Sequence, residues 1–331
     1  MTGNRAVRWQ VLVAFAVVYV VWGSTYLGIR YAIESIPPLL MAGTRFLLAG
    51  MILFAVRLRQ TAERPQLVHW RSALVLGFLL VLCGNGGVTW AEQRITSGMA
   101  ALLITSEPLW IVVLNGLRPR GRRPSVRELL GVLVGFGGVA LLLAPQLTTR
   151  AGGAGGTLLW SSLLVIGSAL AWAVGSLYGI NAPSAPDRPM QNGMTMLVGG
   201  ALLLVTGLSS GEGTYSHLQH ITLTSAAAWA YLTIFGSLAA FSAYVFLMQN
   251  TAPAKASTYA FVNPVVAVLL GWGIAGEPID VRSGVAIAII VGAVMLITFG
   301  QPAAKPQVQE PPLKDFSTAS EELYCSVQRR A

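Results

Sequence analysis

The sequence has 331 residues, of which 54% are hydrophobic and only 11% are charged. A soluble protein of this length carries about 25% charged residues, so the composition excludes a surface that faces water throughout. The formal net charge of +9 would suit a nucleic-acid-binding protein, but the placement of the basic residues favours the cytoplasmic face of a membrane and no nucleic-acid partner.

Ten apolar segments follow one another along the chain, and each is long enough to cross a lipid bilayer as a helix. The first follows two arginines and resembles a secretory signal, but it has no convincing cleavage site, so we interpret it as a retained span. The predicted transmembrane helices have the approximate limits 11–33, 37–58, 70–91, 96–117, 128–145, 157–180, 192–209, 225–249, 254–275 and 281–299.

The basic residues predict the orientation of these helices. If both termini lie in the cytoplasm, most of the 22 lysines and arginines fall on that side, as positively charged loops do in membrane proteins. We therefore expect a multi-pass membrane protein with cytoplasmic N- and C-termini.

The two halves of the chain resemble each other at a central proline. Glu107-Pro108 lies in the middle of the fourth segment and Asn263-Pro264 in the middle of the ninth, which predicts two matching interrupted helices. Because five spans per half is an odd number, the halves must insert in opposite orientations.

The sequence thus predicts an all-α transmembrane protein, a ten-helix bundle built from two inverted five-helix repeats. We expect a cytoplasmic N-terminus at 1–10, repeats at 11–145 and 157–299, and a disordered cytoplasmic tail at 300–331, which is rich in proline, glutamine and charge.

Glu107 is the most unusual residue of the apolar segments. At a rise of 1.5 Å per residue it lies about 15 Å from either end of its segment. An acid at that depth in lipid costs roughly 2.5–3.5 kcal/mol, so it should face a cavity or a partner. Glu107 and Arg45 are our candidates for coupling: Glu107 contacts substrate or carries a proton, or the two form a structural ion pair.

Further aromatic and polar residues are expected at a similar depth, on faces that helical spacing brings together. Aromatic rings would suit the apolar part of a small amphipathic solute, and amides and hydroxyls its polar head. Plain packing remains the alternative for the tryptophans. The candidate substrate-binding residues are Trp22, Tyr26, Asn85, Thr89, Glu107, Trp172, Ser176, Tyr244, Tyr259 and Asn263.

Two other features have structural interpretations. We expect Glu92 and Arg94 to form a solvated turn outside the membrane. Pairs of small residues four apart, such as Gly131 and Gly135, allow close helix approach, either within the bundle or in a homodimer.

The sequence has no phosphate-binding G-x-x-x-x-G-K-[ST] motif, no H-E-x-x-H motif and no paired acids within one apolar segment. We therefore expect no cofactor, no metal and no enzymatic activity.

Several short motifs, each weak alone, occur in an order and spacing that resemble those of EamA-type permeases of the drug/metabolite transporter superfamily, near the YedA-like subgroup. The motifs are Trp22-Gly23-Ser24-Thr25-Tyr26, Gly43-Thr44-Arg45-Phe46, Trp90-Ala91-Glu92-Gln93, Thr258-Tyr259-Ala260-Phe261-Val262-Asn263-Pro264 and Glu277-Pro278.

This resemblance implies a carrier in the bacterial plasma (inner) membrane, often an exporter of amino acids or related small metabolites. It implies a cavity lined mainly by helices one, three, four, six, eight and nine. It also implies a neutral residue where this chain has Glu107. The alternatives are a drug or other metabolite permease, possibly proton-coupled, and a membrane-embedded enzyme.

Overall fold

The computed structural model describes residues 3–61, 64–118, 124–148, 154–185, 187–215, 220–251 and 259–300, and within these ranges the chain forms helices joined by short connections. The predicted tail beyond Gly300, part of the arginine-rich loop after the fourth segment, and Thr258 lie outside the described residues.

The first half of the chain forms five helical segments. The first and third are each a continuous helix with a π-helical stretch, written η, in its middle. In chain order the elements are α1 (Gly3–Val17), η1 (Val18–Trp22), α2 (Gly23–Ala32), α3 (Pro38–Gln60), α4 (Leu67–Leu76), η2 (Gly77–Gly86), α5 (Gly87–Ala91), α6 (Ser97–Ile104), α7 (Glu107–Leu117) and α8 (Val126–Thr148).

The second half repeats this order, with a short extra helix after its second segment. Its elements are α9 (Ala154–Gly179), α10 (Arg188–Ser209), α11 (Glu212–Tyr215), α12 (Leu223–Tyr231), η4 (Leu232–Ala239), α13 (Ala240–Asn250), α15 (Tyr259–Ala275) and α16 (Val281–Gly300).

Ten helical segments of the described chain are apolar. Eight are long enough to cross a membrane, and two shorter ones, Val262–Ala275 and Val281–Leu296, follow them. Large apolar side chains remain exposed on them, including Leu133 at 70% and Trp272 at 60%. Such a surface suits lipid rather than water, so the predicted all-α transmembrane fold is confirmed.

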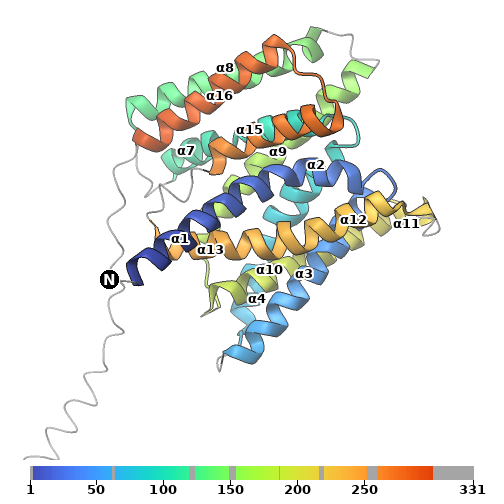
Figure 1. The fold of residues 1–331 in the computed structure, drawn as a ribbon, viewed down its shortest axis with the longest axis vertical. Coiled ribbons are helices and arrows are strands. Elements are labelled where there is room, and N and C mark those ends of the chain that lie inside the picture. The colour runs from blue at the N-terminus through green and yellow to red at the C-terminus, as the bar shows by residue number, and fades with distance from the viewer. Residues whose placement is uncertain are drawn as a thin grey trace, which may run out of the picture. The chain divides into compact units, whose positions relative to one another are not determined.

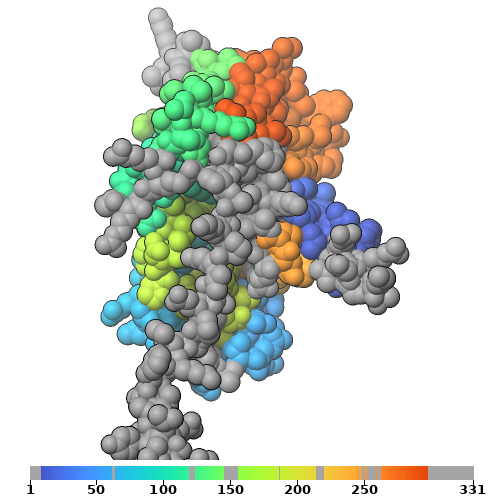
Figure 2. Space-filling view, turned by 90° about the vertical axis from the view of Figure 1, so that its left-hand side faces the viewer, coloured from blue at the N-terminus to red at the C-terminus, as the bar shows by residue number. Residues whose placement is uncertain are grey.

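Equivalent helices of the two halves pack against each other. The second helices, α3 and α10, lie side by side, and so do the fifth helices, α8 and α16 (Figure 1). In the space-filling view the orange-red surface of α16 adjoins the green surface of α8 (Figure 2). This pairing is what two related halves produce when they meet across a common axis.

Glycines make the α3–α10 contact close. A Cβ at Gly50 would lie 2.7 Å from the backbone nitrogen of Leu197, and one at Gly200 would lie 2.6 Å from that of Leu47. Neither position therefore admits a side chain without moving a helix backbone, as in the small-residue crossings of membrane bundles.

The prediction of two matching interrupted helices is right for the fourth segment and wrong for the ninth. The fourth segment breaks between α6 and α7, where the hydroxyl groups of Thr105 and Ser106 donate to carbonyl oxygens of the preceding turn. In contrast, α15 continues through Pro264. Since Pro264 lies close to the start of α15, the hydrogen bond that proline removes falls near the helix end, where it disturbs the helix least.

Candidate functional site

Three of the predicted site residues form one aromatic cluster. The ring centroids of Trp22 and Tyr259 are 5.1 Å apart, those of Trp22 and Tyr244 are 5.3 Å apart, and those of Tyr244 and Tyr259 are 5.7 Å apart. The separations and the tilted or edge-on orientations are those that aromatic pairs favour. The rings come from the first, eighth and ninth segments, so the cluster joins both halves of the chain.

Trp22 is held where two π-helical segments meet. It is the last residue of η1, and its Nε1 donates to the carbonyl oxygen of Gly236 in η4 at 3.2 Å. The next residue, Gly23, lies so close to α15 that a Cβ would be 2.6 Å from Val266 Cβ and 3.1 Å from the carbonyl oxygen of Asn263. π-Helical turns occur frequently at functional sites, and here two of them position one tryptophan.

Glu107 lies near this cluster. It is the first residue of α7, is partly buried, and lies close enough for its charge to act on Tyr26, Tyr244 and Tyr259. The ion pair with Arg45 that the sequence left open does not form among the described residues. Glu107 therefore lies near the aromatic cluster, and that it faces a substrate cavity remains a prediction.

Four other predicted residues lie on α9 and on the two elements that it packs against, η2 and α5. Asn85 donates to the carbonyl oxygen of Leu80 at 3.2 Å, within η2. The ring of Trp172 lies against Gly84, where a Cβ would be 2.7 Å from its Cε3. Thr89 is buried in α5 and Ser176 is half-buried in α9. That this group and the aromatic cluster line one shared cavity remains a prediction.

The side-chain amide nitrogen of Asn263 is hydrogen-bonded to backbone carbonyl oxygens. Turned towards them, it donates to the carbonyl oxygens of Tyr259 at 3.2 Å and Tyr19 at 3.3 Å. These bonds connect α15 to the first segment, next to the aromatic cluster.

Arg45 has partners other than Glu107. The side chain is only 5% exposed, its Nε donates to Ser237 Oγ at 2.9 Å, and its guanidinium carbon lies 4.7 Å from the centroid of the Phe46 ring. The acid whose charge acts on Arg45 is Glu92, at the end of the third segment.

Glu92 is not part of a solvated turn, and that expectation is wrong. The residue is 5% exposed, and neither carboxylate oxygen has a hydrogen-bond partner among the described residues. Burial raises the pKa of the Glu92 carboxyl well above its usual range. The charge of Glu277 raises this pKa further, while Arg30 and Arg45 oppose the rise. Its neighbour Arg94 is exposed and stacks on Trp90 at 4.7 Å, as a residue at the membrane edge can.

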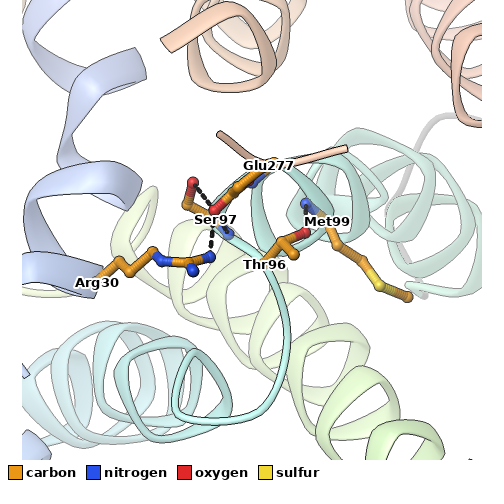
Figure 3. Close-up of polar contacts among 6 residues, drawn as sticks. Arg30, Thr96, Ser97, Met99 and Glu277 are labelled. Carbon is orange, nitrogen blue, oxygen red and sulfur yellow. Dashed lines mark hydrogen bonds and ion pairs between the residues drawn. The ribbon is translucent and has the colours of Figure 1, made fainter. Parts of the chain in front are cut away.

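Glu277 is a second buried acid near Glu92, and both of its carboxylate oxygens accept hydrogen bonds. Glu277 follows α15, after a turn at Gly276 that has a positive φ of 64°. One carboxylate oxygen accepts from Arg30 at 2.6 Å and from the nitrogen and hydroxyl of Ser97 at 2.9 and 2.8 Å. The other accepts from the Gly98 nitrogen at 3.1 Å. Figure 3 shows Glu277 reaching both Arg30 and Ser97.

We call this set of contacts the Glu277 latch: Glu277 with Arg30, Ser97 and Gly98. It places a carboxylate at the first turn of α6, where the helix dipole favours negative charge. The latch also joins the second half of the chain to the first. Sequence reasoning quoted Glu277-Pro278 as a motif without connecting it to Ser97, because the two lie 180 positions apart.

The family comparison agrees with this architecture. The model of the EamA-like transporter family matches residues 8–144 and again residues 159–299, so it recognises each half separately. The chain belongs to this family. It is therefore a membrane transporter with a repeated fold, as the motifs of the sequence indicated.

Individual relatives support the same conclusion. The chain is 37% identical over 307 residues to the uncharacterized inner membrane transporter YedA of Escherichia coli strain K12, covering 90% of this chain and 95% of the relative. It is 24% identical to the uncharacterized transporter YvbV of Bacillus subtilis, with 90% and 94% covered. One crystal structure, 19% identical, matches with a TM-score of 0.59 over 88% of this chain and 98% of its own, which supports the fold alone.

Proposed function

We propose that this EamA-family transporter is a secondary carrier that exports amino acids or related small metabolites by alternating access. The observation that carries the proposal is the cluster of Trp22, Tyr244 and Tyr259, which is built from both halves and lies within reach of the charge of Glu107. A site between the repeats is where carriers of this architecture bind their substrates.

The residues divide into two roles. Aromatic walls would contact the apolar part of the solute, and the carboxylate of Glu107 would attract an ammonium group. Amides and hydroxyls would complete the recognition of the polar head. The proposed walls are Trp22, Tyr26, Trp172, Tyr244 and Tyr259, and the proposed polar contacts are Asn85, Thr89, Glu107, Ser176 and Asn263.

Counterflow tests this proposal. The purified chain is placed in liposomes loaded with one amino acid at a time, and uptake of the same labelled amino acid is followed. We expect saturable counterflow for at least one amino acid. Uptake that never saturates would indicate a channel, and saturable counterflow of aromatic cations but of no amino acid would indicate a drug permease.

Substitutions in the aromatic cluster are the first prediction. Removing the indole of Trp22 deletes both ring contacts and the bond to Gly236, so Trp22→Ala should lower counterflow at least tenfold, equivalent to about 1.4 kcal/mol of lost interaction. Trp160→Ala is the matched control, because Trp160 is 74% exposed on the apolar surface. Equal counterflow by Trp22→Ala and Trp160→Ala would show that the aromatic cluster is not part of the substrate site.

We also propose that the protein lies in the bacterial inner membrane with both termini in the cytoplasm. In that orientation Ile279, exposed beside the Glu277 latch, faces outwards, and Gln60, exposed at the end of α3, faces inwards. In a variant lacking Cys83 and Cys325, an impermeant maleimide applied to intact cells should label Ile279→Cys but not Gln60→Cys. The reverse pattern would invert the topology.

A further inference from the structure

Glu92 and the Glu277 latch belong to one group of charges. Charges that act on Glu92 come from Glu277 after α15, Arg30 on α2 and Arg45 on α3. Tyr26 on α2 also lies within range of Glu92. α9 also packs against α5, and its Ser168 hydroxyl donates to the carbonyl oxygen of Cys83 in η2 at 2.8 Å.

The two acids of this group are bonded in opposite ways. Glu277 receives four hydrogen bonds from Arg30, Ser97 and Gly98, so its negative charge is compensated. Glu92 is equally buried, yet neither of its oxygens has a hydrogen-bond partner in the described part of the chain. An ionised carboxylate in that position would have lost its water without gaining a hydrogen bond in return, whereas the neutral acid loses much less. The latched conformation is therefore one that favours the protonated form of Glu92.

We propose that Glu92 is the proton-carrying residue of this transporter and that its protonation closes the Glu277 latch. With the proton bound, Glu277 alone attracts Arg30, and the two halves stay joined. When the proton leaves, the O–H bond of the Glu92 carboxyl breaks and the proton passes to water. The new carboxylate then repels Glu277 and competes for Arg30 and Arg45. Latch opening admits water to Glu92, so proton release and opening favour each other.

This inference rests on the alternating access of the proposed function. It moves the coupling proton from Glu107 to Glu92, because Glu107 lies beside the aromatic cluster and has no contact with the latch among the described residues. Glu107 then keeps the role of a substrate contact.

The test measures the latch without any substrate. Spin labels on Gln93→Cys, beside Glu92 in the first half, and on Ile279→Cys, beside Glu277 in the second, report the separation of the halves. Both positions are exposed, and Cys83 and Cys325 are replaced. Pulsed electron paramagnetic resonance then gives the distance distribution between the labels over a series of pH values.

In the otherwise unchanged protein we expect a short distance at low pH and a growing longer component as the pH rises. Glu92→Gln, which mimics the protonated acid, should keep the short distance at every pH. Glu107→Gln is the matched control and should follow the parent. Glu92→Met provides a second uncharged side chain of similar length, so that the test does not depend on one variant folding.

A parent without pH dependence, or uncharged Glu92 variants that retain it, would overturn the proposal. Because no solute is present, failure of amino-acid counterflow would not change this result. Conversely, if counterflow occurs but the distance between the spin labels does not depend on pH, only the proposed role of Glu92 is refuted and the proposed function stands.

Discussion

Three acids of this chain show how neighbours, rather than depth, decide what a carboxylate does. Glu277 is satisfied by Arg30, Ser97 and Gly98. Glu107 is partly exposed beside aromatic rings, and Glu92 is buried without a hydrogen-bond partner in the described chain. Counting along the sequence identified Glu107 as the functional acid, because only that acid lies in the middle of an apolar segment. The other two owe their surroundings to distant parts of the chain.

Removing the charge of Glu277 should destabilise the protein. Glu277→Gln leaves Arg30 without its ion pair and puts an amide nitrogen beside donors. Breaking a buried pair costs about 3–5 kcal/mol, and since the Arg30 side chain is 37% exposed we expect about 2–3 kcal/mol. Thermal unfolding of the purified protein in detergent measures the loss.

Asp280→Asn is the control for this variant. Its ion pair with Arg282 is exposed on both sides, and pairs of that kind contribute about 0–1 kcal/mol. Asparagine can also keep the helix-capping bond to the Ser283 nitrogen. A Glu277→Gln variant as stable as Asp280→Asn would show that the latch contributes nothing to stability.

At the scale of the helices, the sequence predicted the number of apolar helical segments and their positions well, because both depend on hydropathy alone. The predicted limits 37–58 and 192–209 compare with Pro38–Gln60 and Arg188–Ser209 in the structure. The three π-helical stretches of the described chain were not predicted, since a shift in backbone hydrogen bonding leaves apolar composition unchanged. The continuity of α15 through Pro264 was missed because the position of its first residue could not be read from the sequence.

The candidate site, too, has a part that could be predicted from the sequence and a part that could not. Trp22, Tyr244 and Tyr259 could be named as candidates from the sequence, because aromatic residues within apolar segments can be found by inspection. That their three rings touch one another could not be read from it. The burial of Glu92 could not be foreseen. A residue at a helix end is usually solvated, whereas Glu92 is buried within range of the charges of Glu277, Arg30 and Arg45, which come from distant parts of the chain.

The crossing of α2 and α15 at Gly23 makes a prediction at this scale. In Gly23→Ala the new methyl group would meet Val266 Cβ at 2.6 Å, closer than such atoms approach. Forcing a methyl into a packed contact costs about 1–3 kcal/mol. Because Trp22 is the adjacent residue, counterflow should fall together with the unfolding temperature.

Gly137→Ala is the matched control for Gly23→Ala. Gly137 lies within α8, and a Cβ there would meet nothing within 4 Å. Alanine favours the helix over glycine by about 0.8–1.0 kcal/mol, so this variant should be as stable as the parent or more stable. Loss of stability in Gly137→Ala equal to that in Gly23→Ala would mean that the crossing is not the cause.

On the scale of the whole described chain, two of the contacts between the halves differ in how they are held. The α3–α10 pair is held at both ends: Glu212 accepts from the nitrogens of Leu39 and Leu40 at 3.0 and 2.9 Å, and Arg57 holds Asp187 through two bonds of 2.6 and 3.0 Å. Close glycine contacts lie between these ends. The Glu277 latch, by contrast, depends on one carboxylate. A change of access that separates the halves should therefore open the latch and leave α3 against α10.

Cross-linking distinguishes these two contacts. A short bis-maleimide linker joining Arg57→Cys to Asp187→Cys would fix α3 to α10, and the same linker joining Gln93→Cys to Ile279→Cys would fix the latch closed. We expect counterflow of an amino acid that the liposome assay identifies to stay within about twofold of the unlinked protein in the first case. In the second it should fall at least tenfold, because a barrier raised by about 1.4 kcal/mol or more slows the exchange by that factor. The same double-cysteine proteins before linking provide the reference, since they carry the substitutions without the restraint. Equal loss in both proteins would mean that α3 and α10 also move apart, and the opening would then have to involve the whole contact between the halves.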